Sequence, residues 1–273
     1  MGLCGRIEDT LRALIPLLKE KTDDSFLRAQ LDLYEKVKEH LQIYVNDEGS
    51  KNKISPEFVA ATINDLAADD AIFTVDTGMC CVWGARYIHS TGKRKMLGSF
   101  NHGSMANAMP MAIGAAFSHP GRQVIAMCGD GGLSMLLGDL ATIKQYNLPV
   151  KLVVFNNRAL GMVKLEMQVQ GLPDNETDMV NPEFAQIAEA MGFKGITVGE
   201  PSGVKEALQE AFNDEGPVLL NIMTNPASLA MPPRIEWEQL KGYALSMSKL
   251  ILGGRMDEVL DTVRANYKHL IEL

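Results

Sequence analysis

The sequence predicts an α/β protein built on a doubly wound, parallel, six-stranded sheet with helices on both faces. Short apolar segments and helical segments alternate along most of the chain, which is the order expected when helices connect parallel strands. Polar residues and glycines also follow three of the apolar segments. Ligands of such sheets bind beyond the carboxyl ends of the strands, so these residues also indicate where a site would lie.

Each predicted strand is a short apolar run. The strands are expected at residues 71–76, 95–99, 122–128, 150–156, 193–198 and 217–223. Helices are expected around and between them, at residues 57–68, 81–90, 104–117, 133–146, 158–167, 182–191 and 203–213. The first of these has a clear start, because Ser55 is a good N-cap and Pro56 suits the first helical position.

Two amphipathic helices are expected before the first strand, since apolar side chains recur at helical spacing over residues 7–20 and 25–42. A polar, charged and glycine-containing stretch follows them and reads as a linker. We therefore expect four parts: leading helices at 1–45, a linker at 46–54, the α/β domain at 55–235 and a C-terminal helical tail at 236–273. The alternative for the leading helices is that they pack on the α/β domain.

Composition excludes several classes of protein. The chain has 273 residues, 46% of them apolar and 22% charged, as globular proteins do. A formal net charge of −8 argues against nucleic-acid binding, which needs a basic face. The four cysteines form no CxxC pair, so neither a zinc site nor a disulfide framework is predicted. The missing disulfide framework fits a reducing cytoplasm, and acidic residues before the first apolar stretch argue against a signal peptide. No apolar run is long enough for a membrane span, so we expect a cytoplasmic protein.

An aspartate between glycines ends the predicted strand 122–128, in the stretch Cys128-Gly129-Asp130-Gly131-Gly132. A carboxylate there costs free energy unless something pairs with it. Asn157 ends the next predicted strand, 157 − 130 = 27 positions later, so one crossover would bring both side chains to one crevice. Carboxylate and amide oxygens are ligands for Mg²⁺ or Ca²⁺, and Mg²⁺ commonly adds substrate phosphates.

The two glycines after Asp130 favour a phosphate, because bare backbone lets an anion approach the start of the next helix. The sequence therefore predicts a metal-bridged diphosphate. The alternative is that the GDGG stretch is only a strand-to-helix turn and that Asn156-Asn157 is only a cap.

The paired motif resembles the signature of thiamine-diphosphate enzymes, which begins GDG and ends NN just under thirty residues later. Further stretches resemble the pyruvate oxidase (pyruvate dehydrogenase, quinone) branch of that family: Gly98-Ser99-Phe100-Asn101-His102-Gly103-Ser104-Met105-Ala106-Asn107-Ala108-Met109-Pro110, Asn156-Asn157-Arg158-Ala159-Leu160-Gly161 and Met231-Pro232-Pro233-Arg234-Ile235. The resemblance covers nearly the whole chain, including the two leading helices. Acetolactate synthase, a sister family, is the second candidate.

The resemblance implies roles for single residues. The side chains of Asp130 and Asn157 and the carbonyl of Ala159 would ligate Mg²⁺, the carbonyl of Gly103 would accept from the 4′-amino group of the cofactor, and Met105 would hold the cofactor bent. The implied cofactor-binding residues are Gly78, Met79, Gly103, Ser104, Met105, Asp130, Gly131, Gly132, Asn157, Ala159, Leu160, Gly161, Met162 and Val163. Of these, Gly131, Gly132, Gly78 and Met79 would line the diphosphate.

Two residues are implied to be catalytic, Met162 and Glu166, which share a helix face at i and i+4. Relatives often have Phe at the first of these positions, which leaves substrate gating open. The alternatives are a solvated helix charge for Glu166 and core packing for Met105, since methionine fills gaps readily. His102 lies beside glycine in a loop and is not included among the catalytic residues.

The resemblance also implies parts outside this chain. In the family, a glutamate from a pyrimidine-binding N-terminal domain or subunit activates the cofactor, and pyruvate oxidases bind FAD in a middle domain. Residues 1–45 resemble the end of that middle domain, so we expect a fragment, a split-gene product or a truncated gene. We expect a homodimer or tetramer that acts on pyruvate only with the N-terminal part, and a non-catalytic cofactor-binding module is the alternative. A scaffold that needs no metal is a third reading.

The C-terminal residues 256–271 form a predicted amphipathic helix. Related quinone-reducing enzymes place such a helix at the membrane surface, which would mean peripheral contact with the inner face of the cell membrane. The polar face carries both signs of charge, so packing on the chain's own domain or on a partner is the favoured reading.

Overall fold

The computed structural model describes residues 2, 4–45, 53–230 and 236–271. The chain divides into two compact units, Met1–Ile43 and Tyr44–Leu273. The first unit contains α1 (Ile7–Leu14), the short 3₁₀ turn η1 (Ile15–Leu17) and most of α2 (Ser25–Val45). Both leading helices are therefore present, and most of the predicted linker 46–54 lies outside the described residues.

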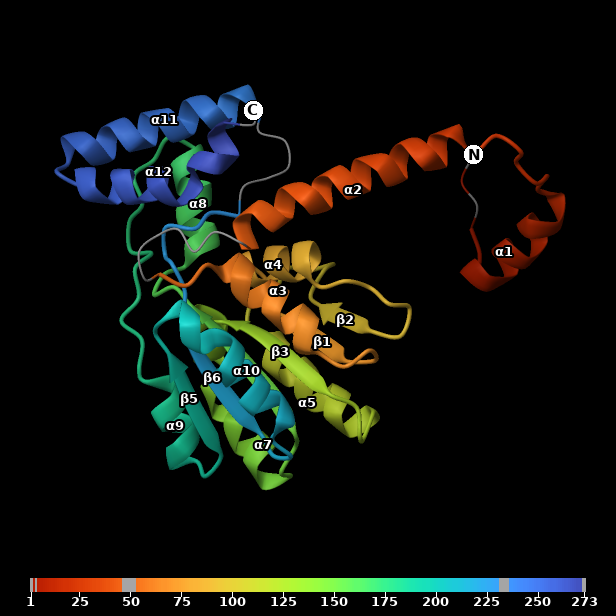
Figure 1. Ribbon diagram of the computed structural model, residues 1–273, viewed down its shortest axis with the longest axis horizontal. Coiled ribbons are helices and arrows are strands. Elements are labelled where there is room, and N and C mark those ends of the chain that lie inside the picture. Colours follow the sequence, from red (N-terminus) through yellow and green to blue (C-terminus); the bar gives the residue numbers. More distant parts are fainter. Residues whose placement is uncertain (1, 3, 46–52, 231–235, 272–273) are drawn as a thin grey trace. The chain divides into compact units, whose positions relative to one another are not determined.

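The second unit is built on one parallel six-stranded sheet, which confirms the predicted fold class (Figure 1). Its strands are β1 (Ile72–Val75), β2 (Lys95–Gly98), β3 (Val124–Gly129), β4 (Val150–Asn156), β5 (Lys194–Val198) and β6 (Val218–Met223). Their spatial order is β2-β1-β3-β4-β6-β5, and every neighbouring pair runs parallel. The four inner strands β1, β3, β4 and β6 are buried along nearly their whole length, as expected of a sheet covered on both faces.

Helices cover both faces of the sheet. One face carries α3 (Pro56–Leu66), α4 (Met79–Tyr87) and α10 (Val204–Asn213), and the other carries α5 (Ala108–Ser118), α6 (Asp130–Met135), α7 (Leu140–Gln145) and α9 (Phe184–Ala190). The predicted start of α3 is confirmed, because the Ser55 hydroxyl accepts from the Phe58 N–H at 3.3 Å. A further helix, α8 (Gly161–Val169), follows β4.

The helices that accompany the sheet all differ from their predicted bounds, most of them by one to three residues at an end, and three of them differ for identifiable backbone reasons. The helix expected at 104–117 begins only at Ala108, because Ala106 takes a left-handed φ of 63°. The helix expected at 158–167 begins at Gly161, because Arg158 has φ 54°. The helix expected at 133–146 is two short helices, α6 and α7, separated by a 3₁₀ turn at Leu137–Asp139. Non-glycine residues in the left-handed region interrupt a helix, and hydrophobic periodicity does not reveal them.

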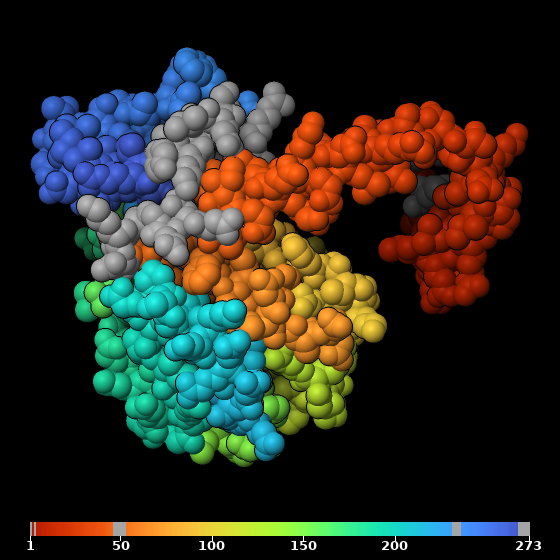
Figure 2. All heavy atoms as spheres, in the orientation of Figure 1, coloured from red at the N-terminus to blue at the C-terminus, as the bar shows by residue number. Residues whose placement is uncertain are grey.

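The C-terminal tail is a helical hairpin of α11 (Trp237–Leu252) and α12 (Met256–Ile271). It lies beyond the carboxyl edge of the sheet, on α8, and forms a layer of its own in the space-filling view (Figures 1 and 2). The approach to α8 is close: a Cβ on Gly242 of α11 would lie 1.9 Å from the Val169 carbonyl oxygen. Val259 and Asn266 of α12 are buried, so α12 packs within the second unit. None of the helices among the described residues is both long and apolar enough to cross a membrane.

Lys151 is a buried cation in the central strand β4, only 3% exposed. Its ammonium group donates to the main-chain oxygens of Asp214 and Gly216. Burial lowers the pKa of Lys151 to about 8, and attraction to Asp214 offsets only part of this effect. Because an unfolded lysine keeps its proton to higher pH, the unfolded chain binds more protons above pH 8, and stability rises with pH in that range.

Lys151→Met is therefore expected to remove this pH dependence of the free energy of unfolding. Between about pH 7 and about pH 9.5, the free energy of unfolding of the wild type should rise relative to that of the variant. Urea denaturation at both pH values measures this difference, and the comparison cancels groups that titrate in both proteins. Parallel pH profiles would show that Lys151 keeps an ordinary pKa in the folded chain.

Candidate functional site

One pocket lies at the carboxyl edge of the sheet, where the ends of β1, β3, β4 and β6 meet. It is lined by twelve of the residues predicted to bind the cofactor: Gly78, Met79, Met105, Asp130, Gly131, Gly132, Asn157, Ala159, Leu160, Gly161, Met162 and Val163. These residues come from five separate stretches of the sequence. The parallel order of the strands brings them together, as the strand-end argument predicts.

Asp130 is the buried carboxylate of the pocket, 3% exposed at the start of α6. Its Oδ1 accepts from the Gly131 N–H at 3.0 Å and its Oδ2 from the Asn181 side-chain amide at 2.7 Å. Burial raises the pKa of Asp130, and these donors offset only part of the shift. Among the described residues no cation pairs with this carboxylate, so a bound metal ion would supply the missing positive charge.

The two asparagines at the end of β4 have different surroundings. Asn156 is buried, and its amide donates to Asn221 Oδ1 at 2.9 Å across the neighbouring strand β6. Asn157 lines the pocket, and its Oδ1 accepts from the Ala159 N–H at 3.0 Å around the left-handed residue Arg158. The tight turn therefore places the side chain of Asn157 and the residue Ala159 beside one another in the pocket wall.

The predicted metal ligands fit a hard divalent cation. They offer one carboxylate, one amide oxygen and one main-chain carbonyl, and oxygen is the donor that Mg²⁺ and Ca²⁺ prefer. Among the described residues no group of three or more His, Cys, Asp or Glu side chains could hold a metal ion, so the predicted set combines one carboxylate with an amide and a main-chain oxygen. The ligand roles of Asp130, Asn157 and Ala159 remain predictions.

Three glycines of the pocket lie at positions that do not favour any larger residue. A Cβ on Gly131 would lie 2.8 Å from Leu160 Cδ2, and one on Gly161 would lie 2.8 Å from Asn157 Nδ2. Gly78, before α4, has φ 124° and ψ −148°, a conformation that favours glycine. The backbone can therefore line the pocket directly, as close contact with a phosphate group requires.

Asp76, at the end of β1, joins three segments around the pocket. Its Oδ1 accepts from the Ala108 N–H of α5 at 2.9 Å, and its Oδ2 accepts from the Gly129 N–H of β3 at 3.1 Å. Burial raises the pKa of Asp76 although these donors act against the shift. The sequence marks Asp76 as an unusual strand-end residue without indicating its role, because its partners lie 32 and 53 residues away.

Some predicted residues lie outside this pocket. Gly103 and Ser104 are exposed in the loop before α5, where the Gly103 N–H donates to the Ser99 carbonyl at 2.7 Å. Glu166 is also exposed and lines a different cavity of about 510 Å³ between α4, α8, α11 and α12. Met162 lines both spaces, so it separates the second cavity from the pocket. The roles proposed for Gly103, Ser104 and Glu166 remain predictions.

The sequence reasoning missed several residues of the pocket. Its lining also includes Pro56, Thr77, Trp83, Thr224, Asn225 and Ser228. Asn181 was missed as well, although it donates to Asp130 and to Asn156 Oδ1 at 2.7 and 2.9 Å. A polar run after β6 could have indicated Thr224 and Asn225, but nothing in the local sequence distinguishes Asn181.

Comparisons with known proteins agree with the geometry. A family model described as "Thiamine pyrophosphate enzyme, C-terminal TPP binding domain" matches residues 76–222, more than half of the chain. A "Putative thiamine pyrophosphate-containing protein YdaP" of Bacillus subtilis is 35% identical over 244 residues, which cover 88% of this chain and 41% of that protein.

Acetolactate synthases are similar as well. The "Acetolactate synthase large subunit" of Porphyra purpurea is 38% identical over 62% of this chain and 29% of its own length. The mitochondrial "Acetolactate synthase catalytic subunit" of Aspergillus candidus is 32% identical over 85% of this chain and 34% of its own length. The chain spans less than half of these relatives. The family model and the name of the Bacillus subtilis protein both refer to thiamine pyrophosphate, and none of these names is pyruvate oxidase. The comparisons therefore support the thiamine-pyrophosphate enzymes as the family and not the pyruvate oxidase branch specifically.

Proposed function

Because the chain belongs to the thiamine-pyrophosphate enzymes and carries their C-terminal cofactor-binding domain, we propose that it binds Mg²⁺ and thiamine diphosphate as half of an active site for a 2-oxo acid. The observation that carries the proposal is the pocket itself. Twelve predicted cofactor-binding residues, including the three predicted metal ligands, line one space at the carboxyl edge of the sheet. When bound, the cofactor supplies a nucleophilic carbon and an electron sink for decarboxylation.

The residues of this chain hold the charged end of the cofactor. Asp130, Asn157 and the Ala159 carbonyl would bind Mg²⁺, and the bare backbone at Gly131, Gly132 and Gly78 would contact the diphosphate. Met105 and Met162 lie in the walls of the same pocket and would contact the rings. These side chains would bind and orient the cofactor.

The reaction class that the relatives support best is that of acetolactate synthase, in which a 2-oxo acid is decarboxylated and condensed with a second one. The names of similar proteins favour it. Pyruvate oxidase is the second candidate, supported by the stretch from Gly98 to Pro110, and it would add FAD bound outside this chain. Either reaction would need the activating glutamate of a pyrimidine-binding domain or subunit, so this chain by itself is expected to bind the cofactor without turnover.

The test is a titration of the purified chain with thiamine diphosphate, with and without Mg²⁺. Trp83 lines the pocket and gives a fluorescence signal, which Trp237→Phe isolates from the second tryptophan. We expect saturable binding that requires the metal. Absence of binding in excess Mg²⁺ would refute the proposal.

Product analysis separates the candidate reactions once an N-terminal segment from a relative is added. Pyruvate consumed to acetolactate supports the synthase, and pyruvate consumed to acetate with reduction of an electron acceptor supports the oxidase. Metal-dependent cofactor binding with neither product would instead support a non-catalytic binding module.

A further inference from the structure

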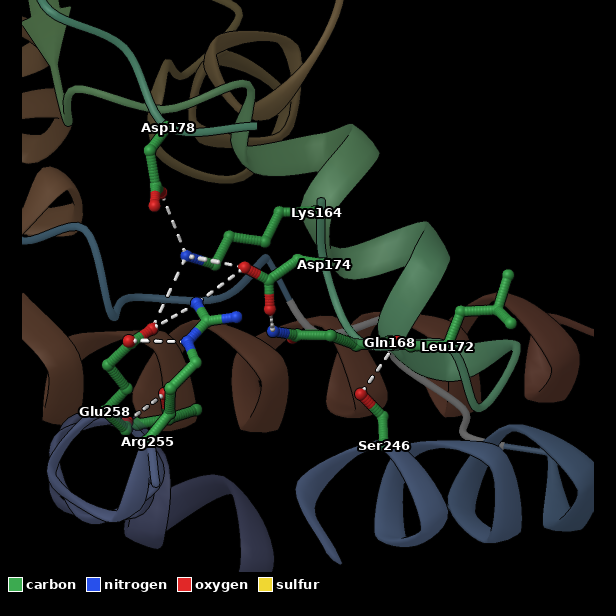
Figure 3. Close-up of polar contacts among 9 residues, drawn as sticks. Lys164, Gln168, Leu172, Asp174, Asp178, Ser246, Arg255 and Glu258 are labelled. Carbon is green, nitrogen blue, oxygen red and sulfur yellow. Dashed lines mark hydrogen bonds and ion pairs between the residues drawn. The ribbon is translucent and has the colours of Figure 1, made fainter. Parts of the chain in front are cut away.

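A buried carboxylate, Asp174, connects the C-terminal hairpin to α8 (Figure 3). Its side chain is 3% exposed and has three partners. Arg255 Nη2 lies 2.8 Å from its Oδ2, Lys164 Nζ lies 3.4 Å from the same oxygen, and Gln168 Nε2 donates to its Oδ1 at 3.3 Å. Although burial acts to raise the pKa of Asp174, these partners lower it overall, so the carboxylate is ionised and paired.

The partners of Asp174 belong to separate elements. Arg255 lies in the turn of the hairpin, where it also pairs with Glu258 of α12 at 2.6 Å. Lys164 lies in the first turn of α8, directly after the pocket residues Gly161, Met162 and Val163. Lys164 reaches Asp178 as well, at 3.2 Å (Figure 3). The cluster therefore joins α12, α8 and the segment after α8.

The same segment continues to the predicted metal ligands. The Leu160 N–H donates to the Thr177 carbonyl at 2.8 Å and the Met179 N–H donates to the Arg158 carbonyl at 2.8 Å. These two bonds frame an antiparallel bridge between Ala159 and Asp178. The residue whose carbonyl is the predicted third ligand is thus held by backbone pairing with residues 177–179.

The segment ends at Asn181, whose amide donates to Asp130 Oδ2 at 2.7 Å and to Asn156 Oδ1 at 2.9 Å. One amide nitrogen therefore joins the ends of β3 and β4 and fixes the orientation of the Asp130 carboxylate. Groups that orient a metal ligand in this way affect metal affinity without touching the metal.

We propose that residues 174–181, here called the brace, position the metal ligands Asp130 and Ala159, and that the C-terminal hairpin holds the brace through Arg255. Asn181 and Asp174 are then positioning residues for cofactor binding. The inference rests on the proposed function, since it concerns how the same pocket binds Mg²⁺ and thiamine diphosphate. In this proposal the hairpin supports the cofactor pocket and has no role at a membrane.

A double-mutant cycle on the full chain tests the brace. The dissociation constant of thiamine diphosphate in excess Mg²⁺ is measured by Trp83 fluorescence for the wild type, Arg255→Met, Asn181→Ala and the double variant. Each single substitution is expected to weaken binding about 10-fold, as loss of a group that orients a metal ligand does. If the brace acts as a unit, the double variant is weakened by about the same factor and not by the product of about 100-fold.

Controls separate positioning from general destabilisation. Ser246→Ala removes the bond from the hairpin to the Leu172 carbonyl (2.8 Å) at the far end of α8, so it should lower the melting temperature and leave cofactor affinity unchanged. Arg255→Lys keeps the charge but not the planar fork that bonds both Asp174 and Glu258, so it should restore only part of the affinity lost in Arg255→Met. If Arg255→Met does not fold, Asp174→Asn replaces it in the cycle, because that substitution removes the charge with which Arg255 pairs.

Three results overturn the brace: unchanged affinity in Arg255→Met, independent effects that multiply in the double variant, or equal weakening by Ser246→Ala. Each of these leaves the proposed function intact, provided that the wild type binds. A wild type that does not bind thiamine diphosphate in Mg²⁺ refutes the proposed function itself, and the two failures are therefore distinguishable.

Discussion

Asp130→Ala is expected to weaken Mg²⁺-dependent binding of thiamine diphosphate by at least about 100-fold, because it removes the carboxylate that is proposed to ligate the metal. The protein should still fold. The side chain is buried and no cation pairs with it among the described residues, so its removal relieves a desolvation cost. Asn181 keeps a partner, because its amide also donates to Asn156. Calorimetric titration of the variant with cofactor and excess Mg²⁺ gives the affinity.

Asp139→Ala is the matched control for this loss. Asp139 lies nine residues further along, in the 3₁₀ turn after α6, and does not line the pocket. Asp139→Ala changes the net charge by the same amount as Asp130→Ala and should leave the affinity for thiamine diphosphate unchanged. If Asp130→Ala bound the cofactor as the wild type does, the metal-independent scaffold would be the better account of the fold.

Gly132→Ala is expected to destabilise the whole second unit. A Cβ at this position would lie 2.2 Å from Asp76 Oδ2 and 3.3 Å from the Ala106 N–H. Asp76 would have to move, and its bonds to Ala108 and Gly129 would weaken with it. Overpacking costs about 1–3 kcal/mol, and disturbing a buried hydrogen-bonded group adds about 1–3 kcal/mol, so we expect a total loss of about 2–6 kcal/mol in the free energy of unfolding.

Gly138→Ala shows how specific that effect is. Gly138 lies six residues away, and a Cβ there meets no atom within 4 Å. Since alanine also restricts the unfolded chain, this variant should be neutral or more stable by up to about 1 kcal/mol. Urea denaturation of both variants measures the difference. Equal stability of the two would mean that Asp76 does not limit the space around Gly132.

The local pattern of the sequence was enough for the secondary structure of the sheet. All six strands occur where short apolar runs predict them, and the signal is strongest for the four inner strands, because a strand buried on both faces needs a nearly continuous apolar run. The bounds of the helices were less predictable. The starts of α5 and α8 depend on left-handed residues, Ala106 and Arg158, whose conformation is set by the surrounding loops and not by apolar periodicity.

The candidate site likewise contains some residues that the sequence predicts and others that it does not. Asp130 and Asn157 could be found because strand ends of a parallel sheet converge, so a position in the sequence predicts a position in space. Asn181 and Asp76 could not be assigned in this way. Their partners lie 25 to 53 residues away, and an asparagine or aspartate in a loop is an ordinary residue until its neighbours are known.

The sequence by itself therefore determined the fold class, the edge of the sheet at which the pocket lies, and most of the glycines and oxygen-bearing residues that line it. These features depend on local periodicity and on chain order. Only the tertiary structure decided that Glu166 lines a separate cavity, that Asp76 connects three segments and that hydrogen bonds link the hairpin to Asp174 and Asn181 to the predicted metal ligand Asp130. Those features depend on side chains far apart in sequence, whose proximity is a consequence of packing.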